Sequence, residues 1–259
     1  MIMLSQPVAS QRFVPPPQAA GYKLAFHDEF DSLDLSPGTA GEHTWYANVW
    51  FDHRRPPAEN IRVENSQLGL TWKKDQGSDN TSIETASPDG QHVKAWRYGY
   101  FEARARWPRV NGAWPAIWML DSEGVRGENI FGGHKDSGEL DIFEGQGDRP
   151  GTFFGTIHHW VDNKRIESNS DGRNIYLLHP GADFGQFHNY GVLWEPGKVT
   201  WYFDDRPLHS EKTYAVFDRQ SYFLILGMQE GVNWKSGDLS GLRNSEMTMY
   251  VDWVRVWQK

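Results

Sequence analysis

Side chains alternate between apolar and polar along several stretches of this 259-residue chain. The alternation is clear in residues 101–107, 199–204 and 247–253. A period of two places successive side chains on opposite faces of a β-strand. Turn-forming clusters such as Glu195-Pro196-Gly197 lie between these stretches, and no long stripe of helical periodicity is seen. Many short strands without intervening helices predict an all-β fold, an antiparallel sandwich or barrel.

Length and composition indicate a single large domain. A chain of this length with 38% hydrophobic residues can bury a sizeable core, and no low-complexity linker or internal repeat divides it. Residues 1–20 contain three consecutive prolines, and we expect them to form an extended tail. They also lack the cationic segment and long apolar run of a secretory signal. The domain is expected to span residues 21–259.

Charge and missing residue types exclude several functions. The net charge of −8 disfavours nucleic acid as a partner, because phosphate backbones need a basic surface. No apolar run approaches the roughly 18 residues of a membrane span. The chain contains no cysteine, which excludes disulfides, thiol nucleophiles and thiolate metal sites. Fingerprints of nucleotide-binding loops, serine hydrolases and zinc proteases are also missing from the sequence.

Aromatic residues are abundant, with 13 Trp, 10 Tyr and 14 Phe. An aromatic face can stack on the apolar face of a sugar ring while neighbouring polar groups bind its hydroxyls. The same composition also fits a tryptophan-rich core. Composition alone therefore leaves carbohydrate binding and core packing as equal alternatives.

Three acidic residues lie close together in the segment 138–145, at Glu139, Asp141 and Glu144. Glu139 and Asp141 share one face of a regular strand, whereas Glu144 would point to the other face. One extra residue in a β-bulge at Ile142–Phe143 would bring all three carboxyl groups to one face. Glycosidic bond hydrolysis needs two carboxyl groups with opposite tasks, and a third between them can separate their pKa values. The alternative is an exposed strand with solvated acids.

Other aromatic and polar side chains are candidates for binding a sugar: Trp114, Trp118, His158, Trp160, Asn233 and Trp234. Trp114 and Trp118 are four residues apart, so one strand face would carry both, as a stacking platform or as paired core tryptophans. His158 shares a predicted strand face with Trp160. It could polarise a hydroxyl or a carboxyl group, or be an ordinary satisfied histidine.

The acidic motif 139–144 and the preceding segment 112–120 resemble glycoside hydrolase family 16. The resemblance extends over about residues 22–258. It includes five flanking segments, residues 27–31, 98–104, 155–158, 187–190 and 251–257.

This resemblance implies a β-jelly-roll of two curved antiparallel sheets, with a substrate cleft on the concave face and residues 21–259 as the catalytic domain. It implies a retaining double displacement in which Glu139 is the nucleophile, Asp141 its electrostatic helper and Glu144 the general acid/base. The motif is similar to that of laminarinase-like members. The expected activity is therefore an endo-β-glucanase acting on β-1,3- or mixed β-1,3/1,4-glucans.

Three departures from the family pattern leave the exact glucan open. Tyr100 stands where many laminarinase-like members carry arginine. The segment 229–234 keeps the family's Asn-Trp pair but has other residues in place of the small ones before it. The loop 121–138 is somewhat long. Catalysis by the family needs no cofactor. Many members bind one structural Ca²⁺ through oxygen ligands, and the matching residues here are Glu29, Ser66 and Asp252.

Two alternatives to a β-glucanase stay open. One is a glycanase or transglycosylase of the same fold that acts on a bacterial exopolysaccharide or a galactan. The other is a non-catalytic carbohydrate-binding module, which would have no need for three converging acids. In each case the expected partner is a polysaccharide, the expected location is extracellular or periplasmic, and the chain is expected to act as a monomer without membrane attachment.

Overall fold

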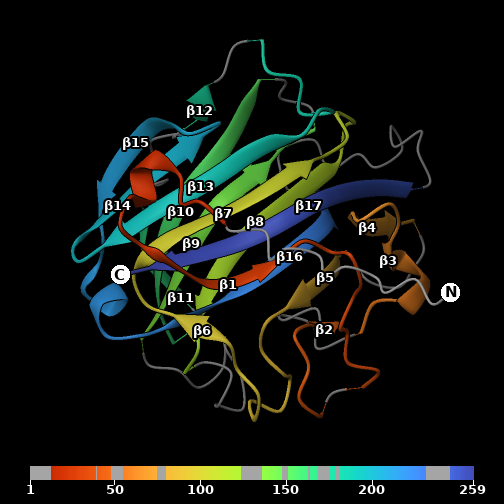
Figure 1. The fold of residues 1–259 in the computed structure, drawn as a ribbon, viewed down its shortest axis with the longest axis horizontal. Coiled ribbons are helices and arrows are strands. Elements are labelled where there is room, and N and C mark those ends of the chain that lie inside the picture. Colours follow the sequence, from red (N-terminus) through yellow and green to blue (C-terminus); the bar gives the residue numbers. More distant parts are fainter. Residues whose placement is uncertain are drawn as a thin grey trace, which may run out of the picture.

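The computed structural model describes most of the chain, and the strands pair into two antiparallel sheets (Figure 1). The described residues are 13–38, 40–47, 55–74, 80–123, 136–147, 151–162, 164–168, 176–178, 181–231 and 246–259. Their helical structure is limited to short 3₁₀ turns, η1 (Pro17–Ala19), η2 (Ala58–Asn60) and η4 (Ala215–Asp218). The predicted all-β antiparallel sandwich is confirmed.

The first sheet has eight strands within the described residues, and β1 (Lys23–Asp28) pairs with β17 beside its main path. The path runs through β15 (Arg206–Lys212), β14 (Lys198–Phe203), β13 (His188–Glu195), β7 (Gly99–Arg106), β17 (Glu246–Gln258), β4 (Leu68–Lys73) and β3 (Ile61–Val63).

The second sheet has nine strands in the described part of the chain. Beside its main path, β12 (Tyr176–Leu178) pairs with β10 and β6 (Ala95–Trp96) pairs with β16. The path runs through β11 (Lys164–Ser168), β10 (Thr152–Val161), β9 (Ser137–Gly145), β8 (Ala113–Asp121), β16 (Tyr222–Glu230), β5 (Asn80–Glu84) and β2 (Tyr46–Ala47).

The core lies between the two sheets and contains the apolar members of the alternating patterns. Phe101 and Ala103 of β7 and Ile117 and Met119 of β8 are fully buried in one hydrophobic cluster. The intervening side chains of each strand therefore face outward. None of the helices in the described residues has the length and apolar character needed to cross a membrane.

Residues 13–22 pack on the outer face of the eight-stranded sheet. Ala19 is fully buried there against Tyr100 and Trp257. The Gln18 side-chain amide donates a hydrogen bond of 2.7 Å to the Tyr100 hydroxyl. Tyr100, which departs from the family pattern, thus lies under this segment and in a different sheet from the acidic strand.

Candidate active site

A β-bulge in β9 brings the three acidic side chains together. Trp118 of β8 pairs with Asp141 and Ile117 with Phe143, so Ile142 has no partner on that strand. On the other side, β10 also shifts register between the partners of Asp141 and Glu144. Leu140, Ile142 and Phe143 are buried in the core between the sheets, and the acids occupy the opposite face. The bulge predicted at Ile142–Phe143 is confirmed.

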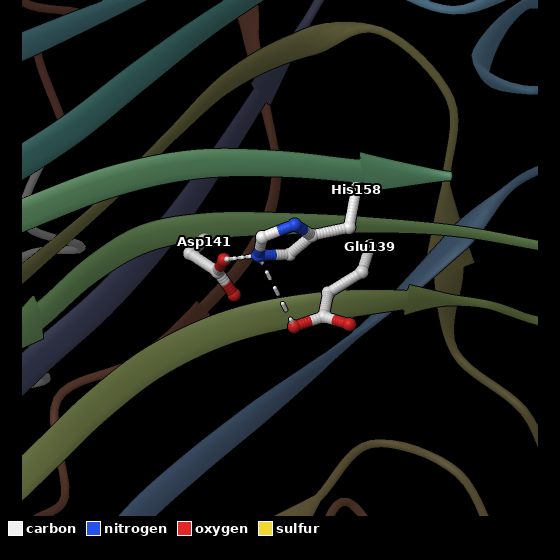
Figure 2. Close-up of side chains that lie close together, drawn as sticks. All are labelled: Glu139, Asp141 and His158. Atoms are coloured by element: carbon white, nitrogen blue, oxygen red, sulfur yellow. Dashed lines mark ion pairs between the residues drawn. The ribbon is translucent and has the colours of Figure 1, made fainter. Parts of the chain in front are cut away.

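Asp141 lies at the centre of a polar cluster. Figure 2 shows the imidazole of His158, from β10, directed at Asp141 and Glu139 of the neighbouring strand. His158 Nε2 lies 3.4 Å from Asp141 Oδ2 and 4.0 Å from Glu139 Oε1. The Thr156 hydroxyl donates a short hydrogen bond to Asp141 and lies 3.3 Å from Glu144 Oε2. Thr156 therefore links two of the acids, which places them on one face.

Each glutamate accepts a hydrogen bond from a separate indole. Trp160 Nε1 donates to Glu139 Oε2 at 2.7 Å, and Trp114 Nε1 donates to Glu144 Oε1 at 3.0 Å. The sequence predicts both tryptophans as sugar contacts, and in the structure they also hold the carboxyl groups in place. Because an indole nitrogen can only donate, each bond stabilises the carboxylate form of its glutamate.

Trp114 and Trp118 share the face of β8 that carries the site. Trp118 is partly exposed and packs against a cluster that includes Leu120, Phe223 and Ile225. Trp114 is also partly exposed, while the intervening Ile117 points into the core. The interpretation of both rings as core tryptophans between the sheets is wrong. Trp118 lies directly opposite Asp141 in the strand register, beside the acids.

Burial raises the pKa of all three carboxyl groups. Burial and the neighbouring Asp141 raise the pKa of Glu144 to about 8, against lowering contributions from His158, Trp114 and Thr156. Burial and Asp141 likewise raise the pKa of Glu139, and burial raises that of Asp141. Three carboxyl groups this close cannot all ionise freely, so the site retains protons near neutral pH. Such a site can supply a carboxylate and a carboxylic acid together.

The acids and His158 could also hold a metal ion. One ligand atom each from Glu139, Asp141 and His158 lies within 4.8 Å of the others. A metal-bound histidine normally donates its second ring N–H to an acceptor. The Nδ1 atom of His158 is buried and has no hydrogen-bond partner among the described residues. The site therefore lacks the outer contact that usually orients a histidine ligand.

The residues expected around calcium are engaged in other contacts. The Glu29 carboxylate accepts two hydrogen bonds from Arg255, at 3.0 and 2.8 Å. Asp252 pairs with Arg104, and the Ser66 hydroxyl donates to the side chain of Asp31 at 2.9 Å. None of these bonds joins Glu29, Ser66 and Asp252 to one another. A cation bound to Asp252 would compete with Arg104.

Two predicted sugar contacts, Asn233 and Trp234, lie outside the described residues. Residues 124–135 of the long loop 121–138 lie outside them as well. The role of Thr156 was missed from the sequence, although its position two residues before His158 on a predicted strand places it on the same face.

Comparisons with known proteins agree on one family. A model described as "Glycosyl hydrolases family 16" matches residues 54–255. The chain is 27% identical to the glucan endo-1,3-beta-glucosidase A1 of Niallia circulans, covering 94% of this chain and 39% of that protein. It is 28% identical to the beta-glucanase of Rhodothermus marinus, covering 93% and 87%. The catalytic domain of an endo-1,3-beta-glucanase (laminarinase) from Thermotoga petrophila RKU-1 superposes with a TM-score of 0.69 at 25% identity, covering 92% and 98%.

Proposed function

Because the chain belongs to family 16 of the glycosyl hydrolases, we propose that it is a retaining endo-β-glucanase that cleaves β-1,3- or mixed β-1,3/1,4-glucans. The observation that carries the proposal is the group of Glu139, Asp141 and Glu144 on one sheet face, each held by its own donor. The similarity to a glucan endo-1,3-beta-glucosidase and a beta-glucanase supports glucan as the substrate class. The family and jelly-roll fold predicted from the sequence are confirmed.

In the first step of the proposed mechanism, the Glu139 carboxylate attacks the anomeric carbon. The bond to the leaving oxygen breaks as Glu144 donates its proton to that oxygen, which leaves a glycosyl ester on Glu139. In the second step, Glu144 takes a proton from water, the water oxygen bonds to the anomeric carbon, and the ester bond to Glu139 breaks. Two inversions restore the starting anomeric configuration.

Asp141 and His158 act on the charge of this pair. A carboxyl group between the two glutamates disfavours their simultaneous ionisation, and His158 lowers the pKa of both. Burial and Asp141 raise the pKa of both glutamates, so the environment does not separate their roles. The assignment of nucleophile and acid follows from their positions in the family motif.

A panel of polysaccharides tests the function. The enzyme is incubated with laminarin, a mixed-linkage β-glucan, an agarose-type galactan and a bacterial exopolysaccharide, and new reducing ends are measured. We expect internal cleavage of laminarin, with the β-anomer appearing first in NMR spectra. Cleavage of the galactan or exopolysaccharide alone would replace the substrate assignment, and binding without any cleavage would favour a carbohydrate-binding module.

Asp141→Asn should shift the alkaline limb of the pH–activity profile to lower pH. In the wild type, kcat/KM should fall as pH rises through about 8, because Glu144 then loses the proton that it must donate. The Asp141 charge raises the pKa of Glu144, so its removal lowers that pKa and protonated enzyme is lost at lower pH. Initial rates between pH 5 and 10 check this, and a limb that moves upward would contradict it.

Trp118→Ala should weaken turnover and substrate binding together. The ring lies beside Asp141, where stacking would bind and orient a sugar unit. We expect a loss of roughly 10- to 100-fold in kcat/KM for laminarin, shared between kcat and KM. Trp118→Phe, which keeps an aromatic face, should recover much of the loss. An unchanged KM in the alanine variant would argue against stacking.

A calcium ion at Glu29, Ser66 and Asp252 is part of the proposal. Backbone carbonyls of the first two residues and the Asp252 carboxylate would bind it, with Asp252 released from Arg104. Calcium should then raise the melting temperature of the wild type relative to a chelator-treated sample. Asp252→Asn should remove most of this difference. An equal rise in both proteins would contradict a site at Asp252.

We also propose an extracellular or periplasmic location and a monomeric state, because a polymer substrate is met outside the cytoplasm. We propose residues 21–259 as the catalytic domain, and Phe13 and Ala19 of the preceding segment pack on it instead of lying in a free tail. Removal of residues 1–12 should leave activity and melting temperature unchanged. Extending the deletion through Ala19 should lower the melting temperature, because Ala19 is fully buried against Tyr100 and Trp257.

A further inference from the structure

A cavity lies at one end of the eight-stranded sheet, formed by the turn before β7, the ends of β13 and β17 and the residue before β1. Its volume is about 340 Å³. Its lining includes polar, charged and aromatic side chains, among them Tyr22, Arg97, Tyr98, Glu195, Gln258 and Lys259. Figure 1 shows the C-terminal end of β17 beside the start of β1, which is where these segments meet. The catalytic acids lie on the other sheet.

The geometry points to a second carbohydrate-binding site in this cavity, distinct from the face that carries the acids. The inference rests on the proposed function, because it assigns the cavity to a chain of the same polysaccharide. A cavity of this volume falls in the range of small-ligand sites, roughly 300–1,000 Å³.

The Tyr98 ring is held in place before any ligand binds. Tyr98 has φ of +61°, an uncommon conformation for a bulky residue. Gly99 continues the turn with φ of +132°, and a Cβ there would lie 2.4 Å from the Trp257 carbonyl oxygen. The Tyr98 hydroxyl donates to Asp218 Oδ1 at 3.0 Å, and the centres of the Tyr98 and Trp194 rings lie 5.3 Å apart in a T-shaped arrangement. A fixed ring loses little freedom on binding.

The side chains that line the cavity have the chemistry of a sugar-binding site. Tyr22 and Tyr98 supply two partly exposed aromatic rings, each with a cation near it. Lys259 Nζ is 5.5 Å from the Tyr22 ring centre, and Arg97 Cζ is 5.4 Å from that of Tyr98. Aromatic rings suit the apolar face of a sugar, and cations donate hydrogen bonds to its hydroxyl oxygens.

The Glu195 carboxylate decides between classes of ligand. A hydroxyl group both donates and accepts, so it can use Glu195 together with Arg97 and Lys259. An anionic ligand would be attracted by Arg97 and Lys259 but repelled by Glu195, so only part of the lining would bind it, and a purely apolar ligand would leave three charged groups desolvated without partners. Gln258 Nε2 donates to the carbonyls of Arg97 and Tyr98, at 3.2 and 3.1 Å, and so ties the lining together.

A second contact would hold a polymer near the catalytic face without taking part in bond cleavage. Tethering raises the effective concentration of a chain, and this benefit needs a substrate that spans both sites. A short oligosaccharide that occupies one site alone gains nothing from tethering. The inference therefore predicts an effect that depends on substrate length.

The test compares kcat/KM on laminarin with kcat/KM on a short aryl laminari-oligosaccharide. We expect Tyr22→Ala to lower the laminarin value several-fold and leave the oligosaccharide value unchanged. Glu195→Gln provides a second variant that keeps the aromatic walls, and Phe187→Ala serves as a control, because Phe187 is partly exposed but does not line the cavity. Equal losses on both substrates, or no loss on either, would overturn the second site.

Direct binding separates this inference from the proposed function. Calorimetric titration of Glu139→Gln with laminari-oligosaccharides should show two sites per chain, and the double variant with Tyr22→Ala should show one. One site in both proteins would overturn the second site and leave the catalytic proposal standing. Wild-type enzyme inactive on both glucan substrates would instead overturn the proposed function, and titration of the variants would still report on the cavity.

Discussion

Glu139→Ala should abolish hydrolysis of β-glucan, with a fall of about 10⁴- to 10⁶-fold in kcat. Without the carboxylate, no atom at this position can form the glycosyl ester, so a good leaving group cannot restore the first step. The measurement is the release of reducing ends from laminarin and of the aryl group from an activated glycoside. Both should be lost together.

Glu139→Gln is the matched control for folding, because it keeps the size of the side chain and can still accept a bond from Trp160. Burial and Asp141 raise the pKa of Glu139. In the folded protein Glu139 therefore keeps its proton at pH values at which it has already ionised in the unfolded chain. Ionisation of Glu139 therefore costs stability as pH rises above the unfolded value, and the neutral variant should melt at the same or a higher temperature at pH 8. An inactive variant that is also unfolded would not support a catalytic role.

Glu144→Ala should lower turnover of a natural glucan by about 10²- to 10⁴-fold, but its effect should depend on the leaving group. The dinitrophenolate group of an activated glycoside leaves without needing a proton, so the first step should proceed and the glycosyl enzyme should accumulate. Rapid mixing should then show a burst of dinitrophenolate close to one equivalent, followed by slow turnover. The absence of a burst, with equal losses on natural and activated substrates, would contradict the role of general acid.

The local features of the site could be predicted from the sequence. The three-residue step from Asp141 to Glu144 breaks the period of two, and only an extra residue restores a common face. The apolar Leu140 fixes which face points to the core, and the structure buries it there. These conclusions depend on strand geometry within a single segment, where sequence spacing is sufficient.

The partners of the acids depend on strand register and could not be predicted in this way. Trp114 bonds Glu144 because β8 pairs with β9, and Trp160 bonds Glu139 because β10 pairs with β9. Residues 21 to 30 positions apart meet only when the turns between the strands fix the register. The alternation of one strand does not contain this information.

The long-range ion pairs could not be predicted from the sequence either. Arg104 and Asp252 are 148 residues apart, and Arg255 and Glu29 are 226 apart. They meet because β7 and β1 both pair with β17. The family pattern suggested oxygen ligands at Glu29 and Asp252, and the arginine partners of these two residues are evident only from the fold.

Azide rescue tests the central claim most directly, because the configuration of the product reports which glutamate is missing. With Glu144→Ala and an activated glycoside, azide should attack the glycosyl ester on Glu139 and yield a β-glycosyl azide. With Glu139→Ala, azide should replace the nucleophile and yield an α-glycosyl azide. NMR coupling constants of the isolated products distinguish the two. The account predicts the β-azide from Glu144→Ala and the α-azide from Glu139→Ala, and the reverse pattern would contradict it.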